Sequence, residues 1–153
     1  MGIQRYSASL DTTITNAYKM NLTTRATGSN MGLADTLEVF SIYGQESSAS
    51  SELSRIVVQF PVAKITSDRS DGVIPASGSV NFFLRMYNTE HYHTTPKNFS
   101  LTIAAVTKSW EEGYGLDMDE YTDLTYDDAG ANWVKASSGA GDITSWKTAG
   151  GDY

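Results

Sequence analysis

Short apolar runs that alternate with polar residues constrain the fold of this chain more than any other feature. In the run 80–87, every even-numbered residue is apolar: Val80, Phe82, Leu84 and Met86. Successive side chains of a strand point to opposite faces, so this run predicts a strand with one buried side. No window of the sequence keeps the apolar spacing of a helix. The sequence therefore predicts an all-β protein.

The apolar runs are joined by polar loops of 6–13 residues, rich in Ser, Thr and Gly. Loops of this length favour crossings between sheets over two-residue hairpin turns. We therefore expect a single domain over residues 1–153, an antiparallel β-sandwich of the jelly-roll type with long acidic loops towards the C-terminus. Pro61 should end the pairing of the third strand or mark an edge. The expected strands are 12–19, 36–44, 54–62, 79–88 and 99–110.

The composition excludes several kinds of site. The chain has 153 residues and no cysteine, which removes disulfides, thiolate zinc sites and cysteine nucleophiles. No run of about 18 apolar residues is present, so we expect no transmembrane helix and no membrane partner. The N-terminal residues lack the apolar core of a signal peptide, so we expect synthesis in the cytoplasm without export by the usual route.

Charge is distributed unevenly along the chain. The formal net charge is −7, yet residues 1–108 are near neutral, with 8 acidic and 9 basic residues. Residues 109–153 hold 10 acidic residues and only two bases, Lys135 and Lys147. Duplex nucleic acid is bound through basic patches, so we expect no nucleic-acid partner.

The residues that could carry catalysis do not form a known constellation. Glu111 and Glu112 follow Trp110 directly, and glycosidases use two carboxylates about 5–10 Å apart that face the same sugar. Adjacent residues of a strand point to opposite faces, so these two carboxylates do not make such a pair. The two histidines, His91 and His93, have no accompanying G-x-S-x-G motif. We therefore expect that the protein is not an enzyme.

Aromatic residues in the acidic third are candidates for binding sugar rings, because exposed aromatic faces stack on them. Tyrosines that lie among acidic residues are expected to be exposed to solvent, whereas tryptophans are more often buried. We therefore keep a second interpretation, in which each tryptophan anchors an acidic or glycine-rich loop to the core. The candidate ligand-binding residues are Trp110, Trp133, Trp146, Tyr114 and Tyr121.

The segment 111–128 carries eight carboxylates and no basic residue. Calcium takes six to eight oxygen ligands, so this composition permits a calcium site, with Glu112, Asp117 and Asp119 as candidate ligands. The spacing does not match an EF-hand loop, and a solvated acidic loop is the favoured alternative. We expect no other cofactor.

Seven motifs, in order, resemble those of the DNRLRE-type β-sandwich domains, a family similar to carbohydrate-binding modules. They include "GSNMGLADTLEV", "AAVTKSWEEG" and "SWKTAGGDY", and they span nearly the whole chain. Longer segments of the sequence, including "TTITNAYKMNLTTRATGSNMG", also resemble structural proteins of tailed bacteriophages, especially marine ones. The motifs cover residues 11–15, 28–39, 54–65, 74–87, 104–113, 131–137 and 145–153.

The resemblance implies a non-enzymatic virion protein, which decorates or cements a capsid or forms part of a fibre. Its partners would be capsid or fibre subunits, including further copies of itself, and the near-neutral part with its apolar strands would supply the contacts. The alternative is a carbohydrate-binding module that recognises host-surface glycans. Family domains continue with further strands after the motif that matches 145–153, so we expect a neighbouring subunit or further chain to complete the sandwich.

Overall fold

The computed structural model describes residues 2–44, 46–90, 97–116, 129–139 and 143–153. Contacts divide the chain into two compact units: Met1–Ser9 with Gln59–Thr102, and Leu10–Val58 with Ile103–Tyr153. The regular elements of the described residues are antiparallel strands and one short helix, as expected for an all-β chain. They are β1 (Leu10–Thr15), β2 (Ser41–Tyr43), β3 (Ser51–Gln59), α1 (Val62–Ser70), β4 (Lys135–Ser137) and β5 (Thr144–Ser145).

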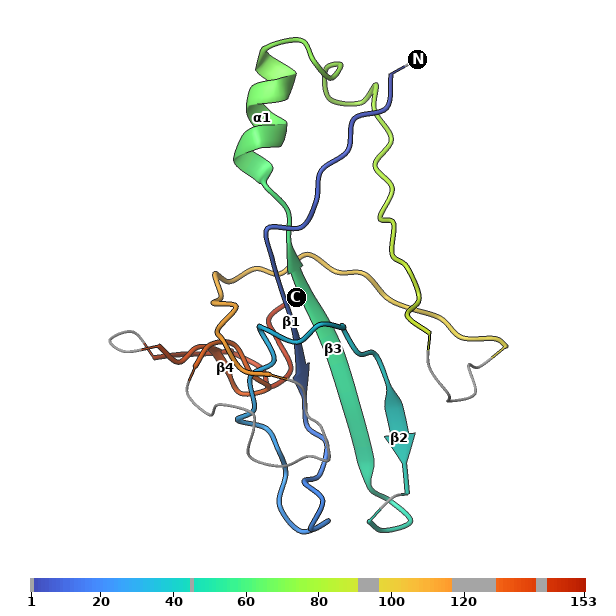
Figure 1. Cartoon of the computed structure of the whole chain (residues 1–153), viewed down its shortest axis with the longest axis vertical. Coiled ribbons are helices and arrows are strands. Elements are labelled where there is room, and N and C mark those ends of the chain that lie inside the picture. Colours follow the sequence, from blue (N-terminus) through green and yellow to red (C-terminus); the bar gives the residue numbers. More distant parts are fainter. Residues whose placement is uncertain (1, 45, 91–96, 117–128, 140–142) are drawn as a thin grey trace. The chain divides into compact units, whose positions relative to one another are not determined.

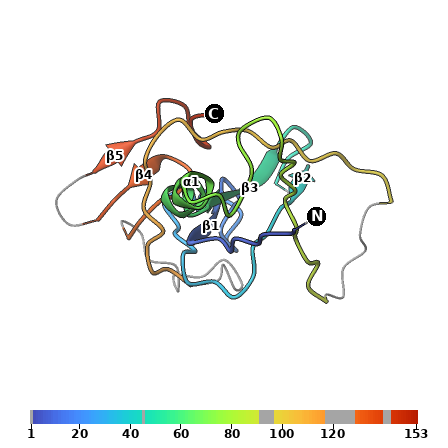
Figure 2. The same cartoon turned by 90° about the horizontal axis from the view of Figure 1, so that it is seen from above.

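A three-stranded sheet, in the order β1-β3-β2, forms the centre of the unit Leu10–Val58 with Ile103–Tyr153 (Figure 1). β2 pairs antiparallel with β3, from Ser41 opposite Leu53 to Tyr43 opposite Ser51. β4 and β5 form a separate antiparallel ribbon in the same unit (Figure 2). That ribbon belongs to residues 109–153, the acidic third of the chain, where we expected long acidic loops.

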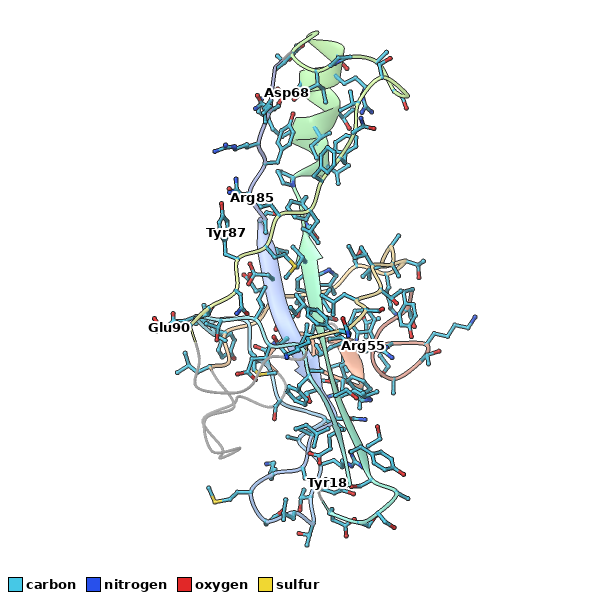
Figure 3. The ribbon with its side chains drawn as sticks, turned by 90° about the vertical axis from the view of Figure 1, so that its right-hand side faces the viewer. Tyr18, Arg55, Asp68, Arg85, Tyr87 and Glu90 are labelled. Atoms are coloured by element: carbon cyan, nitrogen blue, oxygen red, sulfur yellow. The ribbon has the colours of Figure 1, made fainter. Side chains whose placement is uncertain are left out.

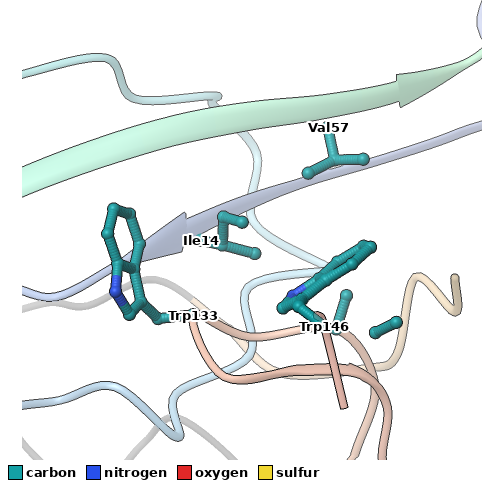
Figure 4. Close-up of a cluster of buried hydrophobic side chains, with 6 residues drawn as sticks. Ile14, Val57, Trp133 and Trp146 are labelled. Carbon is teal, nitrogen blue, oxygen red and sulfur yellow. The ribbon is translucent and has the colours of Figure 1, made fainter. Parts of the chain in front are cut away.

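The core of this unit packs the sheet against two tryptophans (Figure 4). Ile14 of β1 and Val57 of β3 meet Trp133 and Trp146, whose side chains are only 8% and 6% exposed. The indole N–H of Trp146 donates to the carbonyl of Asn132 at 2.8 Å, so the polar edge of the buried ring is satisfied.

The helix α1 corrects the sequence-based expectation, which continued the third strand to residue 62 and placed only a polar loop between it and the strand expected over 79–88. β3 ends at Gln59, before Pro61, as the missing N–H of proline requires. α1 then starts at Val62, and Lys64 pairs with Asp68 one turn later, which supports a helix from its surface. Gly72, with a φ of +74°, follows the helix. The helix has too few apolar residues to show a helical period in the sequence.

Two further expected strands are not formed. Residues 81–90 and 97–107 are exposed, whereas the alternation in 79–88 and 99–110 predicted one buried side for each run. A strand buries a face only when neighbouring strands bring it against a core. Within the described part of the chain, no strand is assigned over 79–110. The prediction of buried strands in these two runs is therefore wrong for this structure.

The unit Met1–Ser9 with Gln59–Thr102 is held together by a buried carboxylate. Asp68 of α1 accepts a hydrogen bond from the hydroxyl of Tyr6 at 2.8 Å and pairs with the ammonium of Lys64. The hydrogen bond from Lys64, and then that from Tyr6, hold the pKa of Asp68 below its ordinary value of 3.8. Burial, followed by the hydrogen bond to Asp68, raises the pKa of Tyr6 above 10.0.

Within the part of the chain that the structure describes, α1 and any other helix are too short or too polar to span a bilayer.

Acid should weaken the contact between the N-terminal segment and α1. Because the folded pKa of Asp68 is lowered, its stabilising contribution is present above about pH 4 and is lost as the pH falls through the folded pKa. We expect Asp68→Asn to lower the unfolding temperature at pH 7. Below pH 3, the difference in unfolding temperature between this variant and the parent protein should become smaller. Thermal unfolding followed by circular dichroism between pH 7 and pH 2.5 measures this. Asp71→Asn, at an exposed carboxylate beyond the helix, is the control, and a pH-independent gap for Asp68→Asn would contradict the assignment.

Candidate functional site

The side chain of Asn30 joins three distant segments of the unit Leu10–Val58 with Ile103–Tyr153. Its amide N–H groups donate to the carbonyls of Glu112 and Ala131, both at 2.8 Å. Its carbonyl accepts from the backbone N–H of Gly115 at 2.8 Å and of Gly32 at 3.2 Å. Asn30 is fully buried, and these four bonds use both donors and both lone pairs of the amide.

Close packing around Asn30 explains two of the glycines in the acidic third. A β-carbon on Gly115 would overlap the backbone carbonyl of Asn30, and one on Gly113 would overlap the Asn30 side chain. Gly113 also has a φ of +80°, which favours glycine. These glycines let segments 112–115 and 30–32 approach closely enough for the four hydrogen bonds to form.

A second buried asparagine shapes the following turn. The side-chain oxygen of Asn132 accepts from the N–H groups of Val134 and Lys135, at 2.9 and 2.7 Å. Its side-chain nitrogen donates to the carbonyl of Gly28 at 3.3 Å. The turn holds Trp133 in the core, and the N–H of Trp133 donates to the carbonyl of Thr27.

The three tryptophans predicted as ligand-binding residues are brought together, but in the core. Trp133 and Trp146 belong to the buried cluster, and the half-buried Trp110 packs against it. This arrangement agrees with the anchoring role expected for them. Burial of Trp133 and Trp146 removes their ring faces from any sugar in this conformation, so stacking by these two residues would require the core to open. Of the three, Trp110 alone keeps substantial exposure.

The other predicted site residues lie apart from a common centre or outside the described residues. Tyr114 is exposed, and Tyr121 falls outside the described residues. The Glu112 carboxylate accepts the backbone N–H of Asp11 at 2.8 Å. The remaining candidate calcium ligands, Asp117 and Asp119, are also outside the described residues. Among the residues that the structure describes, no three His, Asp or Glu side chains gather as metal ligands.

A shallow depression of about 410 Å³ opens beside Trp110. The ammonium of Lys108 donates to the carbonyl of Ser145 at 2.5 Å, and the Glu111 carboxylate accepts the N–H of Gly139 at 3.2 Å. An aromatic ring edged by a carboxylate, an ammonium and hydroxyls is the chemistry that a sugar requires. The lining residues are Thr107, Lys108, Ser109, Trp110, Glu111, Ser137 and Thr144.

The end of the chain turns around Asp152, beside the depression. Its carboxylate accepts the backbone N–H groups of Lys147 and Thr148, both at 3.0 Å. The hydrogen bond from Lys147 is the largest of the effects that lower the pKa of Asp152. Its carbonyl accepts the N–H of Thr107 at 2.9 Å, which ties the C-terminal residues to the segment before Trp110.

Arg55 of β3 holds the same C-terminal turn from the sheet. Its guanidinium donates to the carbonyl of Gly150 at 2.5 Å and lies 5.1 Å from the ring centre of Trp133 and 4.9 Å from that of Tyr153 (Figure 3). Neither Arg55 nor Asn30 was singled out from the sequence. In the sequence, Asn30 stands out only as a member of the motif 28–39. A single polar residue in a loop carries no sign of whether its side chain is buried.

Exposed apolar side chains are the most unusual surface feature. They lie in the runs 80–87 and 99–106, and within the described residues no backbone hydrogen bond joins 80–90 or 97–106 to another segment. A soluble monomer rarely leaves a large contiguous apolar surface in water, so such surfaces mark contacts with other molecules. The exposed residues are Phe82, Phe83, Leu84, Met86, Tyr87, Phe99, Leu101, Ile103 and Val106.

Replacing Asn30 should destabilise the fold strongly. Asn30→Ala leaves two carbonyls and two N–H groups without their partner, and we expect a loss of about 3 kcal/mol or more in the free energy of unfolding. Asn30→Asp should also destabilise, because a carboxylate cannot donate to the two carbonyls. Urea denaturation followed by tryptophan fluorescence measures both. Asn81→Ala, at an exposed asparagine, should change stability by less than about 0.5 kcal/mol. An equal effect of the two alanine variants would show that Asn30 does not hold the segments.

Comparison with protein-family models, curated proteins and solved structures finds no match to this chain. The resemblance to sugar-binding β-sandwiches and to phage structural proteins therefore remains an expectation from the motifs. The geometry supplies two candidate functional regions: the depression beside Trp110 and the exposed apolar runs. These two regions suggest different functions, and each has its own test.

Proposed function

We propose that the protein is a non-enzymatic structural subunit of a virion, which acts through contacts with neighbouring subunits. The observation that supports this most is the exposure of apolar side chains along 80–87 and 99–106. Burying apolar surface stabilises by roughly 25 cal/mol per Å², so covering these side chains would favour association. A subunit that becomes fully ordered only in an assembly has this kind of surface.

The type of fold and the setting of the assembly are proposed from the sequence motifs. The alternation in the two runs is that of strands, so association would let them join a sheet and complete an antiparallel β-sandwich. The motifs resemble those of phage structural proteins, so the setting we propose is capsid decoration, a cement layer or a fibre. The near-neutral residues 1–108 would lie at contacts, and the acidic third would face solvent or another layer.

A carbohydrate-binding module is the second candidate function, and the depression beside Trp110 favours it. The half-exposed indole would stack on a sugar ring. Glu111, Lys108 and Ser137 would exchange hydrogen bonds with its hydroxyl groups. Such a module would serve a fibre that recognises host-surface glycans.

Association in solution tests the leading proposal. We expect the purified chain to form oligomers as its concentration rises from about 1 to 100 µM, a range set by the micromolar end of protein affinities. Sedimentation velocity and light scattering measure this. The paired double variant Phe83→Ser and Ile103→Ser, at two exposed apolar positions, should associate less. The matched control is Leu33→Ser with Val39→Ser, at exposed apolar positions outside the two runs. A monomer at every concentration that also fails to bind purified particles would overturn the proposal.

A glycan panel tests the second candidate. If the depression binds sugar, Trp110→Ala and Glu111→Gln should each weaken binding by tenfold or more, which is about 1.4 kcal/mol. Tyr114→Ala, at an exposed aromatic outside the depression, is the matched control and should bind normally. Circular dichroism checks that Trp110→Ala remains folded. An absence of binding across the panel, or binding that all three variants retain, would rule out the depression as the sugar site.

A further inference from the structure

The run 80–87 combines two properties that together indicate a strand without its partner. Its even-numbered side chains are apolar, and Phe82 is 63% exposed. On the other side, Phe83 is 87% and Tyr87 76% exposed, and the guanidinium of Arg85 lies 4.9 Å from the Tyr87 ring (Figure 3). Both sides of the run therefore face solvent in the isolated chain.

The backbone of this run is free to pair. It contains no proline or glycine, and among the described residues none of its N–H or C=O groups bonds to another backbone group. An extended run of unpaired groups is a template for adding a strand from another chain. Its side chains carry one charge, that of Arg85, and no carboxylate, so no charged partner is required.

We propose that the run 80–87 pairs antiparallel with the same run of a second copy, about a two-fold axis at Phe83. Residues opposite each other would then be Phe82 and Leu84, Val80 and Met86, and Asn81 and Arg85. This proposal rests on the proposed structural function and names its partner as a second copy of the chain. A two-fold contact is self-complementary, because each pair occurs twice.

The alternation selects this register over its neighbours. An axis between Phe83 and Leu84 would place Phe82 opposite Arg85 and Asn81 opposite Met86. An axis at Leu84 would place Arg85 opposite Phe83, and an axis at Arg85 would set two like charges against each other. The axis at Phe83 keeps all even-numbered apolar side chains of both copies on one face and offers Arg85 the amide of Asn81.

The apolar side chains of the run offer surface for further contacts between copies. Three aromatic rings, exposed by 63–87%, present on the order of 450 Å² to solvent, since each ring can bury about 150–250 Å². Pairing edge to edge buries the backbone and only part of this side-chain surface. The paired ribbon would keep one apolar face, so ribbons from two dimers can stack and give even-numbered oligomers.

Cysteine cross-linking tests the register cleanly, because the chain has no cysteine of its own. We expect Phe83→Cys to form a disulfide-linked dimer under mild oxidation, since directly opposite β-carbons lie about 4.5–5.5 Å apart. Asn81→Cys alone should not cross-link, because its two copies would lie roughly 13 Å apart along the ribbon. A mixture of Asn81→Cys with Arg85→Cys should form the mixed dimer. Each position is exposed, so the fold should tolerate the change.

Charge pairing gives a second readout in the full chain. Phe82→Glu and Leu84→Lys should each lower self-association by about tenfold or more, and mixing the two variants should restore it through a new ion pair between copies. Sedimentation velocity measures all three samples, with Leu33→Glu, at an exposed apolar position outside both apolar runs, as the matched control.

The outcomes separate this inference from the proposed function. If the Phe82 and Leu84 variants associate as strongly as the parent protein and Phe83→Cys does not cross-link, the proposed register is wrong. The proposed structural role would not be affected by that result. A monomer in which hydrogen exchange shows 80–87 protected would mean that another part of the same chain covers the run, and would also overturn the inference. Cross-linking at position 83 together with rescue by mixing supports it.

Discussion

The four hydrogen bonds of the Asn30 side chain are the interaction on which the unit Leu10–Val58 with Ile103–Tyr153 depends. They join residues 30–32 to residues 112–115 and 131, which lie about 80–100 positions later in the chain. Each partner is a backbone group, so the junction depends on where the chain runs and very little on the neighbouring side chains. Burying a backbone group without a hydrogen-bond partner costs free energy. One side-chain amide that satisfies four such groups therefore contributes strongly to the stability of the fold. Gly113 and Gly115 follow from this, because a side chain at either position would block the approach.

Once the Asn30 junction is made, the tryptophans can anchor the acidic third. The segment after Ala131 turns on Asn132 and places Trp133 and Trp146 against Ile14 and Val57. Acidic, glycine-rich residues have little apolar surface of their own, so a few large rings must supply the packing. The adjacent glutamates that suggested a hydrolase have structural partners here. Glu112 accepts the N–H of Asp11, and Glu111 accepts that of Gly139.

The two candidate functions depend on different parts of this arrangement. The depression beside Trp110 is lined by residues 107–111 and by one residue each of β4 and β5, and Trp110 packs against the core, so its shape depends on that core. The run 80–87 belongs to the other compact unit. Its apolar residues remain exposed, and association with another molecule is the simplest physical reason to keep them in a sequence. A structural subunit explains this exposure, whereas a free sugar-binding module does not.

The sequence by itself determined the all-β class of the chain and a break in pairing near Pro61, because strand-forming residues and proline act through local geometry. It also indicated that the tryptophans serve as anchors, since large rings in an acidic segment have few other places to pack. It could not reveal α1, whose support is one ion pair and the turn at Gly72, nor whether the runs 79–88 and 99–110 find partners. Only the tertiary structure decided that Asn30 is buried, that Arg55 holds the C-terminal turn and that 80–87 stays exposed. These features depend on contacts between residues far apart in the chain, and no local pattern specifies them.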